Sequence, residues 1–240
     1  MKSSSKNSFF RKSRFVNTVA IAYLFVAILA VILEFFKDKQ LLNLVKPTVI
    51  PCLLFLYWCS TRRINTIYIF ALAAVWLANL FANSNLIFPL VVGTLFLMIY
   101  KVFFIHIVNS SLKMKTLFPI LVSAVPFILF YVLITIIIYK SVEDLFFLYI
   151  SQCVIFVILG AYAMANFFNK SRRSSVYLLI AVVFLIFDQV LGIVFNGNFE
   201  AVGLFFFYLA HYLFCRFLVV DERRRRHHDS FNINVSPKND

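Results

Sequence analysis

The residues best placed to do chemistry in this chain are the polar side chains inside its apolar segments. Asp188 lies within the run YLLIAVVFLIFDQVLGIVF, whose other residues are almost all apolar. A carboxylate at the centre of a bilayer costs about 2.5–3.5 kcal/mol, so it is retained where it faces protein, water or a charged partner. The sequence offers Lys46 and His211 as such partners. Asp188 is therefore the first candidate for a catalytic group.

Further polar residues fall at a similar depth, in the half of the membrane away from the chain ends. At about 1.5 Å per residue along a helix, one slab is predicted to contain Asp188 together with Asn79, Gln152, Tyr208, His211 and Lys46. Taken singly, Asn79 and Gln152 are typical of hydrogen bonds between helices, and His211 is typical of a satisfied core histidine. Lys46 has a second interpretation, in which its long stem reaches the membrane surface.

Lys101 is expected in the other half of the bilayer, where extension toward the inner headgroups accounts for it. It is retained as a candidate substrate-binding residue, together with Lys46, Gln152 and Tyr208.

The elements that position these residues are membrane-spanning helices. Hydrophobic residues make up 62% of the chain and charged residues only 14%, which is too apolar for a soluble domain. About 20 mainly apolar residues are needed to span a bilayer. This criterion predicts an all-α polytopic bundle of about eight helices: Phe15–Phe36, Leu41–Cys59, Ile64–Asn83, Leu86–Val108, Thr116–Tyr139, Asp144–Phe168, Ser175–Phe195 and Ala201–Val220.

The charge distribution predicts the orientation. Seventeen lysines and arginines fall in the tails and in alternate connections, whereas Lys37, Lys39 and Lys140 fall in the connections of the other side. Positive charge is retained on the cytoplasmic side, so both termini are predicted to be cytoplasmic and the protein to lie in a cell membrane, the inner one in a Gram-negative cell. The expected organisation is a basic tail over residues 1–14, a membrane domain over 15–220, and a polar, disordered tail over 221–240.

The sequence gives little support for nucleic-acid binding or for a metal site. The net charge of +13 lies in tails and connections rather than on one helical face, which favours topology anchors over nucleic-acid binding. Arg223–Arg226 retains a second interpretation as an anionic-lipid patch. The four cysteines lack zinc-site spacing. No metal, cofactor or nucleic-acid partner is expected, and the oligomeric state is left open.

The order of these motifs resembles the YhhN family of membrane proteins, which includes lysoplasmalogenases. The resemblance covers nearly the whole hydrophobic body and consists of Lys46-Pro47, ALAAVWLANLF followed by VVGTLFLMIYKVFF, AVVFLIFDQVLGIVF and FFYLAHYLF. Asp188 matches the acid of the family's Phe-x-x-Ser-Asp segment. The chain departs from the pattern where Asn79 stands for an acid, Phe187 for a serine, Lys101 for a histidine and His211 for a glutamine.

The resemblance implies hydrolysis of the vinyl ether of a lysoplasmalogen to a fatty aldehyde and a glycerophospho-base. A general acid would protonate the enol-ether carbon, and a carboxylate would stabilise the oxocarbenium ion before water adds. Asp188 is the expected catalytic group, with His211 or Asn79 assisting, and the phosphate is expected near Lys46. The partner would be a membrane lipid or lysophospholipid.

Two alternatives remain open. Loss of the second acid at Asn79 also fits a lipid-binding protein without turnover, in which Asp188 and Lys46 form a structural ion pair. A small transporter is the third possibility, although the matched broken helices of two repeated halves are not found.

Overall fold

The computed structural model describes the backbone of residues 3–81, 87–112, 117–139, 146–170, 172–194 and 199–235. These residues form eight α-helices and no strand, so the predicted all-α class is confirmed. The predicted span ends Asn83, Leu86, Thr116, Asp144 and Phe195 lie outside them. The helices are α1 (Ser3–Phe35), α2 (Lys39–Ser60), α3 (Thr66–Phe81), α4 (Ile87–Ser111), α5 (Phe118–Ile138), α6 (Phe146–Lys170), α7 (Arg173–Val194) and α8 (Glu200–Val235).

Seven of these helices are long and apolar enough to cross a membrane. The exception is α3, whose 16 residues extend about 24 Å at about 1.5 Å per residue, against a hydrocarbon core of about 30 Å. Residues 82–86, which include part of the predicted third span, lie outside the described residues. The chain is therefore a multi-pass membrane protein with seven full-length helices and one shorter apolar helix.

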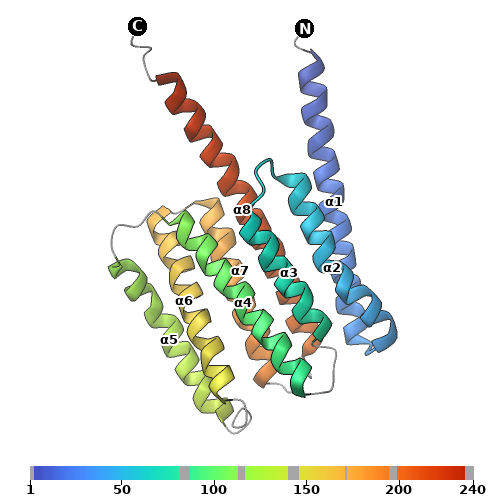
Figure 1. Ribbon diagram of the computed structural model, residues 1–240, viewed down its shortest axis with the longest axis vertical. Helices are drawn as coiled ribbons and strands as arrows, with labels where there is room; N and C mark the ends of the chain where they lie inside the picture. The colour runs from blue at the N-terminus through green and yellow to red at the C-terminus, as the bar shows by residue number, and fades with distance from the viewer. Residues whose placement is uncertain are drawn as a thin grey trace.

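Consecutive helices run antiparallel, as their short connections require (Figure 1). The described start of α1 and the described end of α8 lie at the same end of the bundle. This end, called the basic end below, carries the arginines Arg62, Arg63, Arg172, Arg173, Arg223 and Arg225, and the opposite end carries Glu34, Lys37, Asp38, Lys39 and Glu200. The outer ends of α1 and α8 therefore lie on one side of the bundle, and the prediction that this side is cytoplasmic still rests on the charge bias.

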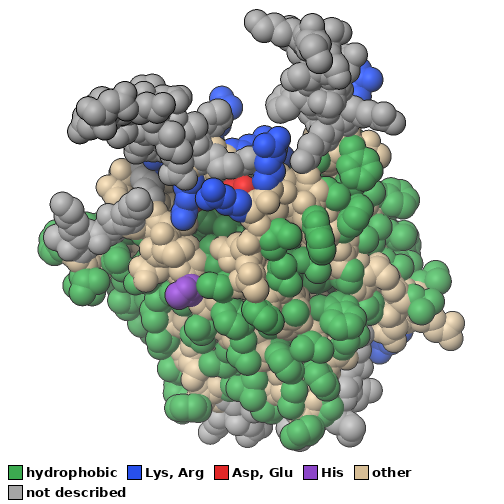
Figure 2. All heavy atoms as spheres, turned by 45° about the horizontal axis from the view of Figure 1, so that its top comes forward, with side chains coloured by type: hydrophobic (Ala, Val, Ile, Leu, Met, Phe, Trp, Pro, Cys, Tyr) green, Lys and Arg blue, Asp and Glu red, His purple; other side chains and the backbone are tan. Residues whose placement is uncertain are grey.

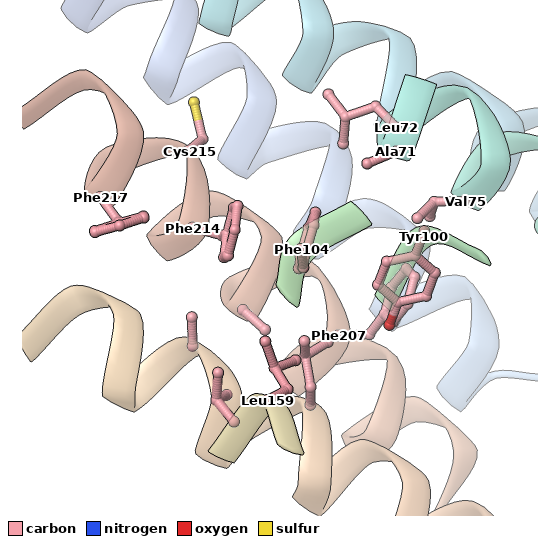
Figure 3. Packing of buried hydrophobic residues seen from close by; sticks show 14 of the residues in the cluster. Ala71, Leu72, Val75, Tyr100, Phe104, Leu159, Phe207, Phe214, Cys215 and Phe217 are labelled. Carbon is pink, nitrogen blue, oxygen red and sulfur yellow. The ribbon is translucent and has the colours of Figure 1, made fainter. Parts of the chain in front are cut away.

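The core is centred on α8, which packs against α1, α2 and α7. Phe104 of α4 stacks on Phe214 of α8 with ring centroids 3.7 Å apart (Figure 3). The ring of Tyr68 in α3 lies beside both of them. By contrast, α5 buries few side chains and lies at the edge of the bundle. Figure 2 shows hydrophobic side chains over much of the flank below a cluster of basic side chains at the basic end.

Two prolines weaken the hydrogen bonding within α2. Pro51 has no N–H, so the carbonyl of Pro47, four residues earlier, has no partner in its own helix. The indole Nε1 of Trp76 in α3 donates to this carbonyl at 3.0 Å. A neighbouring helix therefore satisfies a backbone group that the membrane would otherwise leave unpaired.

Both terminal helices extend beyond their predicted spans. α1 begins at Ser3, inside the predicted basic tail, and α8 continues to Val235, through most of the segment predicted to be disordered. Composition alone favoured disorder, but the arginine-rich stretch after Val220 has good helix propensity and follows a helix without a break. Arg225 also pairs with Asp221 at 2.9 Å, one turn earlier.

Candidate functional site

Asp188 is on α7, about two turns from the end of that helix that faces away from the basic end. Its carboxylate lies against the backbone of α8, where a Cβ added at Gly203 would be 3.2 Å from Oδ1. No described residue forms a hydrogen bond or a close ion pair with this carboxylate. Asp188 instead interacts electrostatically with Lys101 and Lys46, so lysines from two different helices lie within electrostatic range of this carboxyl group.

Lys101 reaches Asp188 from α4 and has only 3% of its surface exposed. Its Nζ donates to Oε1 of Gln152 in α6 at 3.1 Å and lies 3.9 Å from the centroid of the Phe156 ring. Gln152 is near the start of α6, at the end of the bundle away from the basic end. The interpretation that Lys101 extends to the inner headgroups is therefore wrong, because its ammonium group turns into the protein toward Gln152.

Lys46 and Tyr208 lie within electrostatic range of both Asp188 and Glu34, which is at the end of the bundle opposite the basic end. Lys46 interacts electrostatically with both Asp188 and Glu34 of α1. Tyr208 of α8 is within electrostatic range of the same two carboxyl groups, and its backbone carbonyl accepts a hydrogen bond of 2.8 Å from Tyr23 of α1. The hydroxyl of Tyr208 is buried without a partner among the described residues. We call Asp188, Lys101, Gln152, Lys46 and Tyr208 the Asp188 site.

His211 is adjacent to this site rather than paired with Asp188. Its Nδ1 lies 2.7 Å from the carbonyl oxygen of Phe207, one turn earlier in α8. Its ring contacts Tyr100, Phe104 and Phe207. Lys101, and not His211, is the second cation that interacts with Asp188. The Nε2 of His211 is buried with no described partner.

Asn79 is not joined to Asp188 by any described contact. It is buried near the end of α3, with 8% of its surface exposed, and its amide Nδ2 has no described partner. The predicted polar slab therefore contains a connected group around Asp188, a neighbouring His211 and a separate Asn79.

Sequence reasoning missed two carboxyl groups and one glycine. Glu34 and Glu200 come from different helices, and their side chains are within hydrogen-bonding reach of each other. Their position at the ends of apolar segments on the same side as Lys46 was the available signal. Gly203 carried no signal, because its role depends on the carboxylate that lies against it.

An apolar groove of about 310 Å³ lies between α1 and α8 beside these charged residues. Its lining is Val31, Ile32, Phe35, Phe36, Ala201, Val202 and Phe205. Glu34 is flanked by the α1 residues of this lining, and Gly203 by the α8 residues. The volume is within the range of about 300–1,000 Å³ that is common for small-molecule sites. The apolar groove and the carboxyl groups of Glu34 and Glu200 thus lie at the same end of α1 and α8.

The arrangement can bind one class of ligand well, an amphiphile with one apolar chain and a charged headgroup. Among the described residues, no group of three or more histidine, cysteine, aspartate or glutamate side chains is arranged to hold a metal ion. None of the protein-family models, curated proteins or solved structures compared with this chain matches it.

Proposed function

We propose that this multi-pass membrane protein binds a single-chain lysophospholipid and hydrolyses its vinyl ether, with Asp188 as the acid and base. The observation that carries the proposal is the Asp188 carboxylate itself. It has no hydrogen bond to any described residue, two lysines lie within electrostatic range of it, and an apolar groove lies at the same end of α8, lined by Ala201, Val202 and Phe205.

The lipid would lie with its chain along the α1–α8 groove and its phosphate near Lys46. Lys46 is partly exposed and belongs to the same end of the bundle as the groove. Its ammonium group can pair with a phosphate as a point charge. The reacting vinyl ether, which joins chain and headgroup, would then lie between the groove and Lys46, close to Asp188.

The chemistry needs one carboxyl group that changes protonation state twice. The acid form donates its proton to the β-carbon of the enol ether, which produces an oxocarbenium ion and a carboxylate. The carboxylate stabilises this cation electrostatically and then accepts a proton from the water that adds to it. The resulting hemiacetal breaks its bond to the ether oxygen, releasing the aldehyde and the glycerophospho-base, so no redox partner is required.

The second carboxyl group that the resemblance expects at Asn79 has a candidate replacement in Glu34. Glu34 and Asp188 both interact with Lys46. Asn79 can orient water, but an amide does not transfer protons at neutral pH. We assign the proton transfers to Asp188 and an electrostatic role to Glu34.

The test is release of fatty aldehyde from lysoplasmalogen by the purified protein in detergent. General acid–base catalysis contributes about 10²–10⁴-fold, so Asp188→Asn is expected to lower the rate by that factor. Asp38→Asn is the matched control, since Asp38 caps α2 at the same end of the bundle and asparagine is an equally good cap. Equal rates in wild type and Asp188→Asn would remove Asp188 from the reaction.

Lipid binding without turnover is the second candidate. It is favoured by the two lysines around Asp188, which suit a structural anion as well as a reactive one. It predicts that lysophospholipid raises the unfolding temperature of the wild type, that this rise depends on Lys46, and that no aldehyde forms.

A further inference from the structure

A second cavity lies at the basic end, on the side of the bundle away from the Asp188 site. It has a volume of about 330 Å³ and is enclosed by the α2–α3 connection, the end of α4 and α8. Ile107 and Leu218 give it an apolar wall, and Arg63, Asn65 and Arg225 contribute polar groups. We call it the basic-end pocket.

The acceptor groups of this pocket are already bonded within the protein. The carboxylate of Glu222 accepts the backbone N–H of Arg63 at 2.9 Å and the hydroxyl of Thr61. The carboxylate of Asp221 accepts the guanidinium of Arg225 at 2.9 Å. Both acids therefore hold the pocket together through hydrogen bonds to internal donors, and Asp221 also forms an ion pair with Arg225.

The pocket also contains donor groups that no described hydrogen bond uses. No described residue pairs with the guanidinium of Arg63, which lines the pocket and is exposed. The Oδ1 of Asn65 accepts the backbone N–H groups of Ile67 and Tyr68 at the start of α3, so its amide N–H₂ is left to donate. The hydroxyl oxygen of Tyr57 accepts the N–H of Asn65 at 2.9 Å and so holds the start of α3 against the pocket wall.

The charge around the pocket also favours an anion. Arg62 and Arg223 are exposed. Arg62 directly precedes the lining residue Arg63, and Arg223 directly follows the lining residue Glu222. Arg63 and Arg225 line the pocket together with the two carboxylates, and Arg62 and Arg223 add positive charge outside the lining. Figure 2 shows basic side chains gathered at this end with an acidic side chain between them. Guanidinium groups bind phosphate oxygens through paired, charge-assisted hydrogen bonds.

We propose that the basic-end pocket binds a phosphate ester, with the phosphate on Arg63 and Asn65 and the carbon part against Ile107 and Leu218. The ester can come from a membrane lipid headgroup or from a soluble glycerol phosphate, because the pocket recognises the same group in both. This site is independent of the Asp188 site and of its proposed reaction.

The experiment measures the unfolding temperature of the purified full-length protein in detergent, at constant ionic strength. One series titrates glycerol 3-phosphate, and the other adds phosphatidylglycerol to the micelles in place of phosphatidylcholine. The variant is Arg63→Gln, whose backbone N–H still bonds to Glu222. The matched control is Arg62→Gln, which makes the same charge change at the neighbouring residue outside the pocket lining.

Wild type and Arg62→Gln are expected to be stabilised by at least one of the two ligands. Arg63→Gln is expected to bind that ligand about tenfold or more weakly, because it loses a charge-assisted hydrogen bond. A response to glycerol 3-phosphate alone identifies a soluble ligand, and a response to phosphatidylglycerol alone identifies a headgroup. Absence of any response in wild type, or equal loss in Arg62→Gln and Arg63→Gln, would overturn the proposal.

A second variant, Asn65→Asp, separates binding from folding. Aspartate caps a helix as well as asparagine does, so the start of α3 is retained, but an anion replaces the amide donor. This variant is expected to keep the unfolding temperature of the free protein and to lose the response to the ligand. An unchanged response would also overturn the proposal.

Discussion

At the scale of single residues, the function depends on where one carboxylate points. Asp188 could be nominated from the sequence because charges inside membrane segments are costly and need a reason. The direction of the Lys101 side chain could not be predicted from the sequence, since a lysine stem can extend either way along a helix. The hydrogen bond from Lys101 to Gln152 decides the direction, and this bond depends on how α4 and α6 are packed.

Gly203 provides a test at this scale. In Gly203→Ala the new methyl group would lie 3.2 Å from Oδ1 of Asp188, which is close enough to displace the carboxylate. Aldehyde release is expected to fall about tenfold or more, because small misplacements of a reacting group are costly. The unfolding temperature should change little.

Gly192→Ala is the matched control for this substitution. It lies on the same helix as Asp188, and a Cβ there meets nothing within 4 Å. Its activity is expected to equal that of the wild type. If both glycine variants retained full activity, the position of Asp188 against α8 would have no part in the reaction.

At the scale of elements, the apolar runs in the sequence predict which helices form, but they predict the ends of those helices less well. The apolar runs predicted the existence and order of all eight helices. They did not predict the continuation of α8 through the arginine-rich stretch, since a polar composition is shared by disordered tails and exposed helices. Nor did they predict how α2 accommodates Pro47 and Pro51, because the compensating Trp76 belongs to another helix.

The contact between Trp76 and α2 gives a prediction for this scale. Trp76→Phe leaves the Pro47 carbonyl without its donor, and a carbonyl left unpaired away from water costs about 1–3 kcal/mol. The unfolding temperature in detergent should therefore fall. Adding Pro51→Ala restores an N–H four residues after Pro47 and is expected to recover most of the loss. Failure of the second substitution to recover stability would show that the loss came from indole packing.

At the scale of the whole molecule, the charge asymmetry along the sequence becomes an asymmetry between the two ends of the bundle. The described start of α1 and the described end of α8 both lie at the basic end (Figure 1), as an even number of antiparallel helices requires. The sequence predicted this arrangement because alternate connections differ so strongly in lysine and arginine. It could not predict the two cavities, since each is formed by side chains from helices far apart in the chain.

Orientation is tested by single cysteines in a variant whose four native cysteines are replaced by alanine. Lys39→Cys lies at the end opposite the basic end, and Arg62→Cys lies at the basic end. A membrane-impermeant maleimide added to intact cells is expected to label Lys39→Cys alone, and both variants after permeabilisation. Labelling of Arg62→Cys in intact cells would reverse the orientation.

The most direct measurement of the central claim is where a lysophospholipid binds. A lysophospholipid carrying a photoactivatable diazirine on its chain would be cross-linked to the purified protein, with excess lysoplasmalogen as competitor. Competed adducts are predicted on the lining of the α1–α8 groove, at Val31–Phe36 and Ala201–Phe205. The exposed surface of α5, including Leu121, Leu129 and Ile136, should give only adducts that the competitor does not reduce. Equal, uncompeted labelling of the groove and of α5 would contradict the account.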